Sequence, residues 1–222
     1  LVWANLRGVD SHGVLRIPRY LEMLEAGLIN PVATPRVLSE HGAVALVDAE
    51  LAPGAVAMEL VAQKAIEIAG RMGGGFSVGR NITHAGAIGY FAHAIASAGL
   101  VGIVMTASKP LMAYPGARGE AVSTNPLAIA TPSADAHEPI VLDISTAAVA
   151  LGKIMAARDA GRQIPDGWGV DADGRPTTDP TNVKTLLPMA GAKGAGLSLM
   201  LGVLCSLLAD NPIIAPALTG AD

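Results

Sequence analysis

The sequence alternates segments of helical periodicity with short apolar segments, and this alternation restricts the folds that the chain can adopt. The clearest helical pattern follows Pro53-Gly54 and runs to Gly70, with apolar residues recurring on one side. Short strand-like runs lie before and after it, at Val44–Val47 and Phe76–Val78. Helices that alternate with short strands predict an α/β protein, in which helices are layered on a mixed, largely buried sheet.

The second half of the sequence continues this pattern. Residues 100–105 form a nearly continuous apolar run, as expected for a strand that is covered on both faces. Residues 127–130 and 140–142 predict a pair of strands, and residues 146–158 predict a helix. We find no internal repeat and no low-complexity segment.

The composition limits the kinds of partner and compartment. The 222 residues are 51% hydrophobic, which excludes disorder of the whole chain and allows a sizeable core. The net charge is −4 and no basic run occurs, so no nucleic acid is expected as a partner. The single cysteine, Cys205, excludes an internal disulfide and fits a reducing, cytoplasmic location. The apolar run 195–209 is short for a membrane span and no signal peptide is evident, so no membrane is expected.

A polar turn between two apolar elements carries the most distinctive titratable residue. The stretch Arg80–His93 places His84 between the preceding strand-like run and a helical pattern that ends near Gly99. A side chain at a strand-to-helix junction is well placed to face a cleft and is held by two rigid elements. His84 is therefore a candidate catalytic residue, although a solvent-exposed turn histidine fits the same local pattern.

The N-terminal segment supplies a second imidazole and an arginine. Asp10 or Ser11 is predicted to cap a helix in which Pro18 marks either a kink or the true first turn. On such a helix His12 and Arg16 are four residues apart and share a face. An arginine fork beside an imidazole suits a small carboxylate that bears a carbonyl or hydroxyl group. Together with Ser11 they are candidate catalytic and substrate-binding residues; a surface salt bridge is the alternative for Arg16.

Two further positions suggest contacts with a ligand. Lys193 lies among glycines at the start of an apolar helix, where free N–H groups and a lysine fit a phosphate as well as they fit a solvent-facing loop. Asp143 ends a predicted strand, where α/β sheets place ligand contacts, and it also fits a helix N-cap. No G-x-G-x-x-G follows a strand, so a standard Rossmann site is not indicated. His84 and His93 lack the spacing of metal ligands, and no metal is expected.

One short motif points to a different enzyme class. Gly75-Phe-Ser-Val-Gly79 matches the G-x-S-x-G pattern of a nucleophile elbow, with Ser77 as the nucleophile. The elbow requires a strand before the serine and a helix straight after it. Here a run of glycines precedes the motif and extended chain follows it. A serine hydrolase is therefore kept only as an alternative.

Seven short segments, taken together, carry a resemblance to a known family. They are Leu6-Arg-Gly-Val-Asp-Ser-His-Gly-Val-Leu-Arg16, Asn81 to Gly86, Ser123-Thr-Asn-Pro-Leu-Ala128, Leu142-Asp-Ile-Ser-Thr146, Ile164-Pro-Asp-Gly-Trp168, Pro176-Thr-Thr-Asp-Pro180 and Lys193-Gly-Ala-Gly-Leu197. In this order they resemble the malate/L-lactate dehydrogenase family, whose members include ureidoglycolate, sulfolactate, diketogulonate and piperideine-carboxylate enzymes. The segments cover nearly the whole chain, which makes the resemblance specific.

The resemblance implies an oxidoreductase that uses NAD or NADP to interconvert a 2-hydroxy acid and a 2-oxo acid, or to reduce a related cyclic imine acid. It implies a homodimer and a cofactor domain that is not a Rossmann fold. His84 matches the family's proton acceptor, and His12 matches a histidine proposed as the proton donor in some members. Arg16 is the candidate partner of the substrate carboxylate. The positions that match dinucleotide contacts are Ser108, Asp143, Ile144, Ser145 and Lys193.

The same resemblance suggests a division of the chain. Residues 1–75 are expected to form an N-terminal helical segment for substrate binding and dimerisation, and residues 76–222 a cofactor-binding sheet domain. Relative to the family pattern, the N-terminal helix is shortened and the C-terminal third beyond about Asp222 is absent. Ala195 stands where members often carry an aromatic residue. A truncated, non-catalytic relative is therefore an alternative to an active dehydrogenase.

Overall fold

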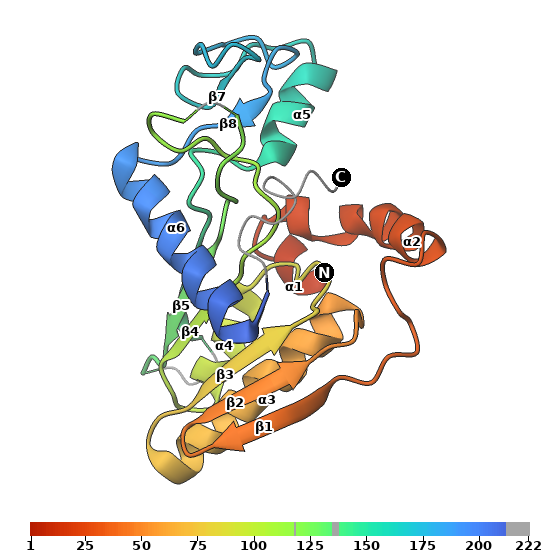
Figure 1. The fold of residues 1–222 in the computed structure, drawn as a ribbon, viewed down its shortest axis with the longest axis vertical. Coiled ribbons are helices and arrows are strands. Elements are labelled where there is room, and N and C mark those ends of the chain that lie inside the picture. Colours follow the sequence, from red (N-terminus) through yellow and green to blue (C-terminus); the bar gives the residue numbers. More distant parts are fainter. Residues whose placement is uncertain (118, 135–137, 212–222) are drawn as a thin grey trace. The chain divides into compact units, whose positions relative to one another are not determined.

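The computed structural model describes residues 1–117, 119–134 and 138–211, which fall into two compact units (Figure 1). The first unit contains residues 1–104, 128–143 and 208–211. The second contains the described residues within 105–127 and 144–207. Helices and short strands alternate along the chain, which confirms the expectation of a mixed α/β protein.

The first sheet combines a hairpin with a crossover helix. β1 (Arg36–His41) pairs antiparallel with β2 (Val44–Asp48), and β2 pairs in parallel with β3 (Phe76–Arg80). α3 (Gly54–Met72) connects the two parallel strands and buries one apolar face that includes Val61 and Ile68. It ends at Gly73, whose φ of 82° lies in the left-handed region that glycine adopts without steric cost.

β1 was not predicted, and its exposure explains why. Five of its six residues are exposed, so the strand lacks the apolar alternation from which strands are recognised. The boundary predicted at residue 75 lies inside the first unit, between α3 and β3. The assignment of the two segments to substrate and cofactor stays a prediction.

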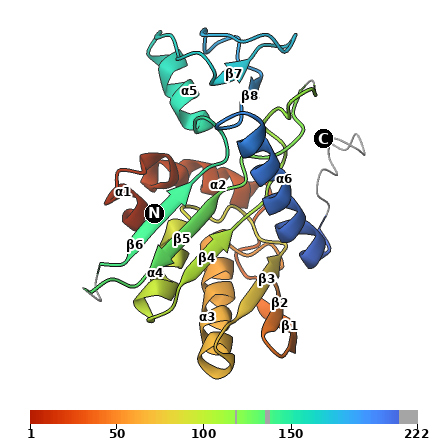
Figure 2. The ribbon, with the colours of Figure 1, turned by 90° about the vertical axis from the view of Figure 1, so that its left-hand side faces the viewer.

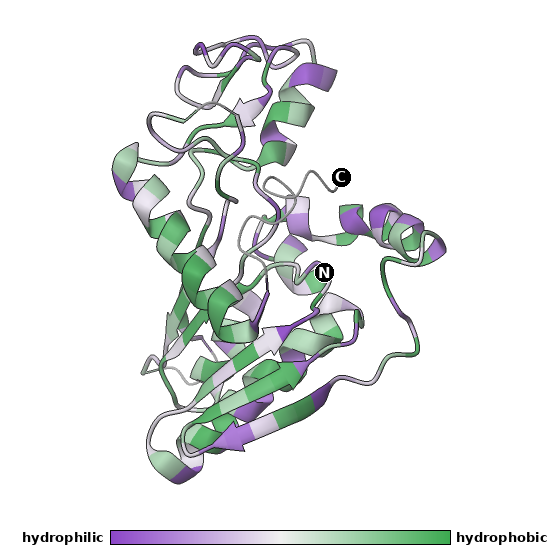
Figure 3. Ribbon diagram, viewed as in Figure 1, coloured by the Kyte–Doolittle hydropathy of each residue, from purple (hydrophilic) through white to green (hydrophobic). Residues whose placement is uncertain are grey.

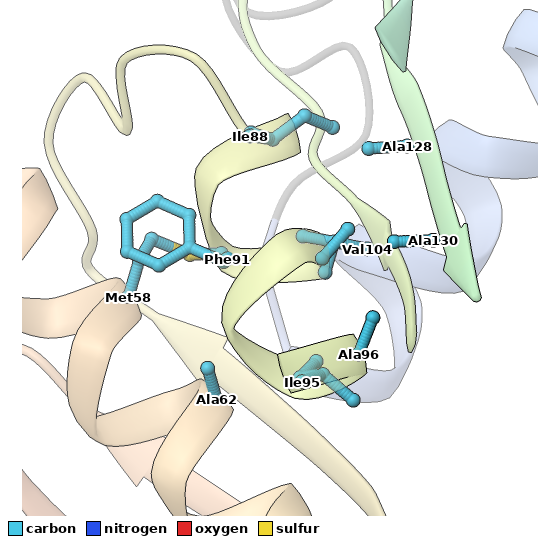
Figure 4. Packing of buried hydrophobic residues seen from close by; sticks show 10 residues of the cluster. Met58, Ala62, Ile88, Phe91, Ile95, Ala96, Val104, Ala128 and Ala130 are labelled. Atoms are coloured by element: carbon cyan, nitrogen blue, oxygen red, sulfur yellow. The ribbon is translucent and has the colours of Figure 1, made fainter. Parts of the chain in front are cut away.

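The second sheet of the first unit packs against α4 (Gly89–Ser97). Figure 2 shows β5 (Leu127–Thr131) between β4 (Gly102–Met105) and β6 (Ile140–Ile144). A Cβ atom added to Gly102 on β4 would overlap Ala92 and Ile95 of α4, so the helix approaches the sheet closely there. The buried cluster, shown in Figure 4, consists of Met58, Ala62, Ile88, Phe91, Ala92, Ile95, Ala96, Val104, Ala128 and Ala130.

β4 differs from its prediction in one respect. Its residues alternate between buried and more exposed positions, and Ile103 is 57% exposed. Among the described residues the strand is therefore covered on one face, and the expectation of cover on both faces is wrong. An apolar residue on an open sheet face has the same hydropathy as a buried one, so the sequence alone cannot separate the two cases.

The N-terminal segment is broken into short helical pieces. They are α1 (Val2–Asn5), the 3-10 turns η1 (Asp10–His12) and η2 (Val14–Arg16), and α2 (Ile17–Glu25). Pro18 lies in the first turn of α2, which confirms the second of the two predicted roles for this proline. The single helix predicted from Asp10 onward is wrong, because the chain is extended at Gly13, where an added Cβ atom would overlap the side chain of Asn5.

The second unit is built around a separate core. It contains α5 (Leu151–Asp159), the two-residue strands β7 (Gly169–Val170) and β8 (Thr185–Leu186), and α6 (Ala192–Ser206). A 3-10 turn (Leu207–Ala209) follows α6. α5 begins at Leu151 rather than at the predicted residue 146, because residues 146 and 147 are buried in non-helical chain. The buried cluster of this unit consists of Met112, Val122, Ala147, Val149, Ile154, Ala157, Ile164 and Leu186.

α6 is hydrophobic along most of its length (Figure 3). By length and composition the stretch Ala192–Ala209 passes a test for membrane-spanning helices, and it is the only such stretch among the described residues. The core helix of a soluble protein passes the same test, so this finding is weak evidence for a membrane span.

The loop between β3 and α4 rests directly on the start of α3. A Cβ atom added to Gly54 would overlap the carbonyl oxygen of His84. The hydroxyl of Thr83 also donates a hydrogen bond to the carbonyl oxygen of Ala52, at 2.8 Å. The absence of a side chain at position 54 therefore allows the loop to reach its place.

Replacing Gly54 by alanine should destabilise the protein by roughly 1–3 kcal/mol, because the methyl group overlaps backbone that has little freedom to move. Gly70→Ala is the matched control: it lies in the same helix, has no atom within 4 Å of the added Cβ, and should raise stability by up to about 1 kcal/mol. Chemical denaturation of the two variants measures both effects. Equal stability of the Gly54→Ala variant and the wild type would contradict the close approach.

Candidate active site

Two histidines, an arginine and a tyrosine meet in the first unit. His84 lies on the loop after β3, and Tyr20 reaches it from α2. The Tyr20 hydroxyl and His84 Nδ1 are 2.8 Å apart and share a hydrogen bond. His84 is therefore partly buried and bonded to another element, which the alternative of a solvent-exposed turn histidine does not describe.

His12 stacks on His84. The two ring centroids are 5.7 Å apart and the planes are inclined by 22°. The Ser11 hydroxyl lies 3.0 Å from His12 Nδ1, so this nitrogen too is bonded to a hydroxyl group. In each imidazole the other ring nitrogen, Nε2, has no hydrogen bond to any described residue. The structure therefore brings together the two histidines that the sequence suggested as catalytic residues, and their catalytic role stays a prediction.

Arg16 sits beside the two imidazoles without a carboxylate of its own. Its Nε donates a hydrogen bond to the carbonyl oxygen of Ser11 at 2.6 Å, which leaves the terminal nitrogens for other partners. It takes part in no ion pair among the described residues. The alternative of a surface salt bridge is therefore not observed.

The charges in this cluster favour neutral imidazoles. Burial lowers the pKa of His84 to about 4, and the positive charges of Arg16 and His12 act in the same direction. Burial also lowers the pKa of His12; Arg16 adds to this effect and Asp143 opposes it. Burial raises the pKa of Tyr20, against the influence of Arg16. At neutral pH the cluster holds an unneutralised guanidinium next to a neutral phenol and a neutral His84.

Asp143 belongs to the same unit as the histidines. It lies near the end of β6 and accepts a hydrogen bond from the backbone N–H of Gly89 at 2.8 Å. Burial raises the pKa of its carboxyl group, while that bond and the charge of His12 lower it. Asp143 is thus an electrostatic neighbour of His12, and its contact with a dinucleotide stays a prediction.

A buried carboxylate holds the loop that carries His84. Asp48, at the end of β2, is 7% exposed and accepts three hydrogen bonds. The donors are the backbone N–H of Glu50 at 3.0 Å, Arg80 Nε at 3.0 Å and Asn81 Nδ2 at 2.9 Å. The bond from Asn81, followed by those from Glu50 and Arg80, keeps the pKa of Asp48 below its usual range despite burial. Arg80 and Asn81 lead directly into the loop, so this network fixes where the loop begins.

The other residues that match dinucleotide contacts lie in the second unit, and Ile144 among them is the last residue of β6. The hydroxyls of Ser108 and Ser123 share a hydrogen bond of 2.6 Å. The hydroxyl of Ser145 donates to the carbonyl oxygen of Thr124 at 3.2 Å. Both hydroxyls are already used within the protein. Ile144 and Ser145 fall on the second-unit side of the division after Asp143.

Lys193 lies in the first turn of α6, as predicted. It is exposed and forms no ion pair among the described residues. No acidic residue occupies this turn, although the positive end of a helix favours negative charge. An unpaired ammonium group at this position therefore suits an anion.

A cavity of about 560 Å³ lies in the second unit. Its walls are apolar or consist of glycine, and they include Tyr114, Pro115, Leu187, Pro188 and Gly191. The volume falls in the range of small-molecule sites. Gly191 is also the N-cap of α6, so the cavity reaches the start of the helix that carries Lys193.

The structure does not support the two other kinds of site considered from the sequence. Ser77 lies in the middle of β3, so the strand–serine–helix arrangement of a nucleophile elbow is absent. Its buried hydroxyl has no hydrogen-bond partner, and hence no hydrogen-bonded base, among the described residues. No group of His, Cys, Asp or Glu suited to a metal ion occurs in the part of the chain that the structure describes.

Tyr20 is the residue of the cluster that the sequence analysis missed. It follows Arg16 by four residues, as Arg16 follows His12, and this repeated spacing could have suggested that Tyr20 shares their face of a helix. The 3-10 turns before α2 break the helix on which the spacing was interpreted. The bond between Tyr20 and His84 joins residues 64 positions apart, which no local pattern predicts.

Comparisons with known proteins confirm the resemblance noted in the sequence. Residues 1–220 match the family described as Malate/L-lactate dehydrogenase. The malate dehydrogenase of Pyrococcus horikoshii is 38% identical over 221 residues, which are 95% of this chain and 61% of the relative. The ureidoglycolate dehydrogenase (NAD(+)) of Escherichia coli O157:H7 is 39% identical over 212 residues, 96% of this chain and 60% of the relative.

Solved structures give the same result. The delta1-piperideine-2-carboxylate reductase from Pseudomonas syringae superposes with a TM-score of 0.89 at 35% identity, covering 95% of this chain and 64% of that one. The sulfolactate dehydrogenase from Methanocaldococcus jannaschii gives a TM-score of 0.83 at 37% identity, covering 90% and 58%. The chain spans about three fifths of the length of the curated relatives that it matches. Because these matches run through almost all of its residues, the chain belongs to the malate/L-lactate dehydrogenase family.

Proposed function

We propose that this protein transfers a hydride between NAD or NADP and a small 2-hydroxy acid or 2-oxo acid. Relatives named malate, ureidoglycolate and L-sulfolactate dehydrogenase support this class of reaction. The observation that carries the proposal is the guanidinium of Arg16, which has no acidic partner among the described residues and lies close enough to His12 and His84 to lower the pKa of both.

Arg16 would bind the carboxylate of the substrate. Its Nε is used by Ser11, so the guanidinium is fixed in orientation while its terminal nitrogens stay available. Two parallel hydrogen bonds from such a fork suit a carboxylate better than the single ammonium of a lysine does. Ser11, held against His12, would assist in placing the substrate.

The second unit has features that fit a dinucleotide. Lys193 is an unpaired cation in the first turn of α6, where free backbone N–H groups also favour an anion such as a pyrophosphate. The cavity beside Gly191 is apolar and large enough for a planar ring. In this unit Ser108, Ile144 and Ser145 are further proposed contacts, by their match to the family. Asp143, in the first unit, is proposed on the same ground. When bound, the nicotinamide supplies the hydride to the carbonyl carbon, or takes it up in the reverse direction.

The chain's own residues handle the proton. In oxidation, neutral His84 takes the proton from the substrate hydroxyl, for which a free ring nitrogen is required. In reduction, the imidazolium form returns a proton to the developing alkoxide. His12, stacked on His84 and next to Asp143, would stabilise the charge on the substrate oxygen or share the proton. Arg16 and the stacked ring orient the acid for both directions.

The proposal extends to the finer architecture and the assembly. We infer that helices layered on the sheets form a cofactor domain distinct from a Rossmann fold, which the absence of a G-x-G-x-x-G motif in the sequence supports. Residues 1–75 would serve substrate binding and dimerisation, and residues 76–222 cofactor binding. We further propose a cytoplasmic homodimer.

The direct test is oxidation and reduction of NAD(H) and NADP(H) with a panel of 2-hydroxy and 2-oxo acids. Turnover of one of these acids supports the proposal. Cofactor binding without turnover of any acid would identify a non-catalytic relative. Labelling of Ser77 by a fluorophosphonate would support the hydrolase alternative.

Replacing His84 by glutamine should lower kcat by about 10²–10⁴-fold, because the group that accepts the proton is lost. Binding of NADH, followed by fluorescence titration, should remain, since no dinucleotide contact is removed. His41→Gln is the control, because His41 is exposed at the end of β1. A near-normal kcat in the His84 variant would exclude this residue from proton transfer.

The pH dependence should report the low pKa of His84. For oxidation, kcat/KM is expected to stay high down to about pH 5 and to fall as His84 becomes protonated around its pKa of about 4. For reduction, kcat/KM should rise as the pH falls toward that value, because imidazolium is the reactive form. A midpoint near the ordinary histidine value of about 6.5 would show that His84 is not desolvated in the working enzyme.

Replacing Lys193 by alanine should raise KM for the dinucleotide by roughly tenfold, the size expected for one lost charge-assisted contact. The KM for the organic acid should change little. Lys153→Ala is the matched control, since Lys153 is an exposed lysine on α5 of the same unit. An unchanged cofactor KM would remove Lys193 from the proposed site.

A further inference from the structure

Tyr20 is the only described residue that forms a hydrogen bond with the His84 ring. Its hydroxyl contacts Nδ1 at 2.8 Å, and its ring centroid lies 5.7 Å from that of His84 at an angle of 48°. A phenol hydroxyl both donates and accepts hydrogen bonds, so the contact by itself permits two tautomers of His84.

The chemistry of the site selects one of the two tautomers. A base needs a lone pair on a nitrogen that the substrate can reach. Tyr20 occupies Nδ1, whereas no described residue bonds Nε2. If Tyr20 donated to Nδ1, the proton of the neutral ring would sit on Nε2 and no accessible lone pair would remain. A working base therefore requires Nδ1–H to donate to the oxygen of Tyr20.

We propose that Tyr20 is a positioning residue that holds neutral His84 as the Nδ1–H tautomer, which makes Nε2 the nitrogen that exchanges protons with the substrate. This role rests on the proposed function, in which His84 accepts the proton during oxidation. The proposal names Nε2 as the reacting atom of His84. It also gives a positioning role to Tyr20, which the sequence analysis did not indicate.

The proton balance follows from this arrangement. In oxidation the O–H bond of the substrate breaks and an Nε2–H bond forms, while Nδ1 keeps its proton and its bond to Tyr20. In reduction the imidazolium loses the proton from Nε2, and the same tautomer is restored. Tyr20 accepts a hydrogen bond from Nδ1–H before and after each transfer and undergoes no net change itself.

Three features of the surroundings fit a fixed acceptor. Burial raises the pKa of Tyr20, so the phenol stays neutral and does not compete as an acid. The backbone carbonyl group of His84 packs closely against Gly54, which limits movement of the residue away from Tyr20. Ser11 holds Nδ1 of the stacked His12 in the same way, so both imidazoles leave Nε2 as the open nitrogen.

The first test is NMR spectroscopy of the full chain with ¹⁵N-labelled histidine, at a pH above 6 and without ligand. Long-range ¹H–¹⁵N correlations distinguish a protonated ring nitrogen from an unprotonated one. We expect Nδ1 of His84 to be protonated and Nε2 to be unprotonated. In Tyr20→Phe, which keeps the ring but removes the hydroxyl, the two tautomers should mix. An Nε2–H tautomer in the wild type, or an unchanged tautomer in the variant, would overturn the proposal.

The second test is kinetic. Tyr20→Phe should lower kcat by about 10–100-fold, as for other groups that orient a functional imidazole, with little change in KM for the acid. Tyr90→Phe is the control, because Tyr90 is 40% exposed on α4 and packs edge-on against Trp3 and Phe91. A normal kcat in Tyr20→Phe would overturn the proposal.

The two tests separate this inference from the proposed function. If the wild-type chain turns over none of the acids in the panel, the proposed dehydrogenase function fails, and the NMR measurement still decides the tautomer. If the chain is active and the tautomer is the opposite one, only the role of Tyr20 fails.

Discussion

The buried carboxylate of Asp48 holds the start of the loop that carries His84. It accepts hydrogen bonds from Glu50, which follows β2, and from Arg80 and Asn81, at the end of β3 and directly after it. A long helix, α3, joins these two strands. Glu50, Leu51 and Asn81 beside it have positive φ angles of 51°, 63° and 54°, which residues other than glycine rarely adopt. Such conformations persist where surrounding bonds over-determine them. The hydrogen bonds to this buried carboxylate therefore determine where the loop that carries His84 begins.

The candidate active-site cluster combines that loop with a less buried partner. α2, which supplies Tyr20, has no buried residue, and Arg16 comes from the 3-10 turn before it. His84 is thus held from one side by backbone packing on α3 and contacted from the other by side chains of an exposed segment. Segments with few buried residues open locally at low free-energy cost.

Much of this organisation could be read from the sequence, and the failures have physical causes. The long helix α3 was predicted from its apolar periodicity, and β2 and β3 were predicted from short runs of strand-forming residues. β1 was not predicted because its side chains are mostly exposed. The N-terminal helix was predicted wrongly because the chain is extended at Gly13, close to the side chain of Asn5. Local context and the resemblance suggested both histidines and Arg16, which the structure places near one another. Tyr20 was missed because its bond to His84 depends on tertiary packing.

The unpaired charge of Arg16 couples the binding of an anion to the protonation of the two histidines. Part of the low proton affinity of His84 and His12 comes from repulsion by this guanidinium. An anion that pairs with Arg16 cancels that part of the effect. Such coupling is reciprocal. Binding of a carboxylate to Arg16 would therefore favour protonation of an imidazole, and protonation would favour binding of the carboxylate.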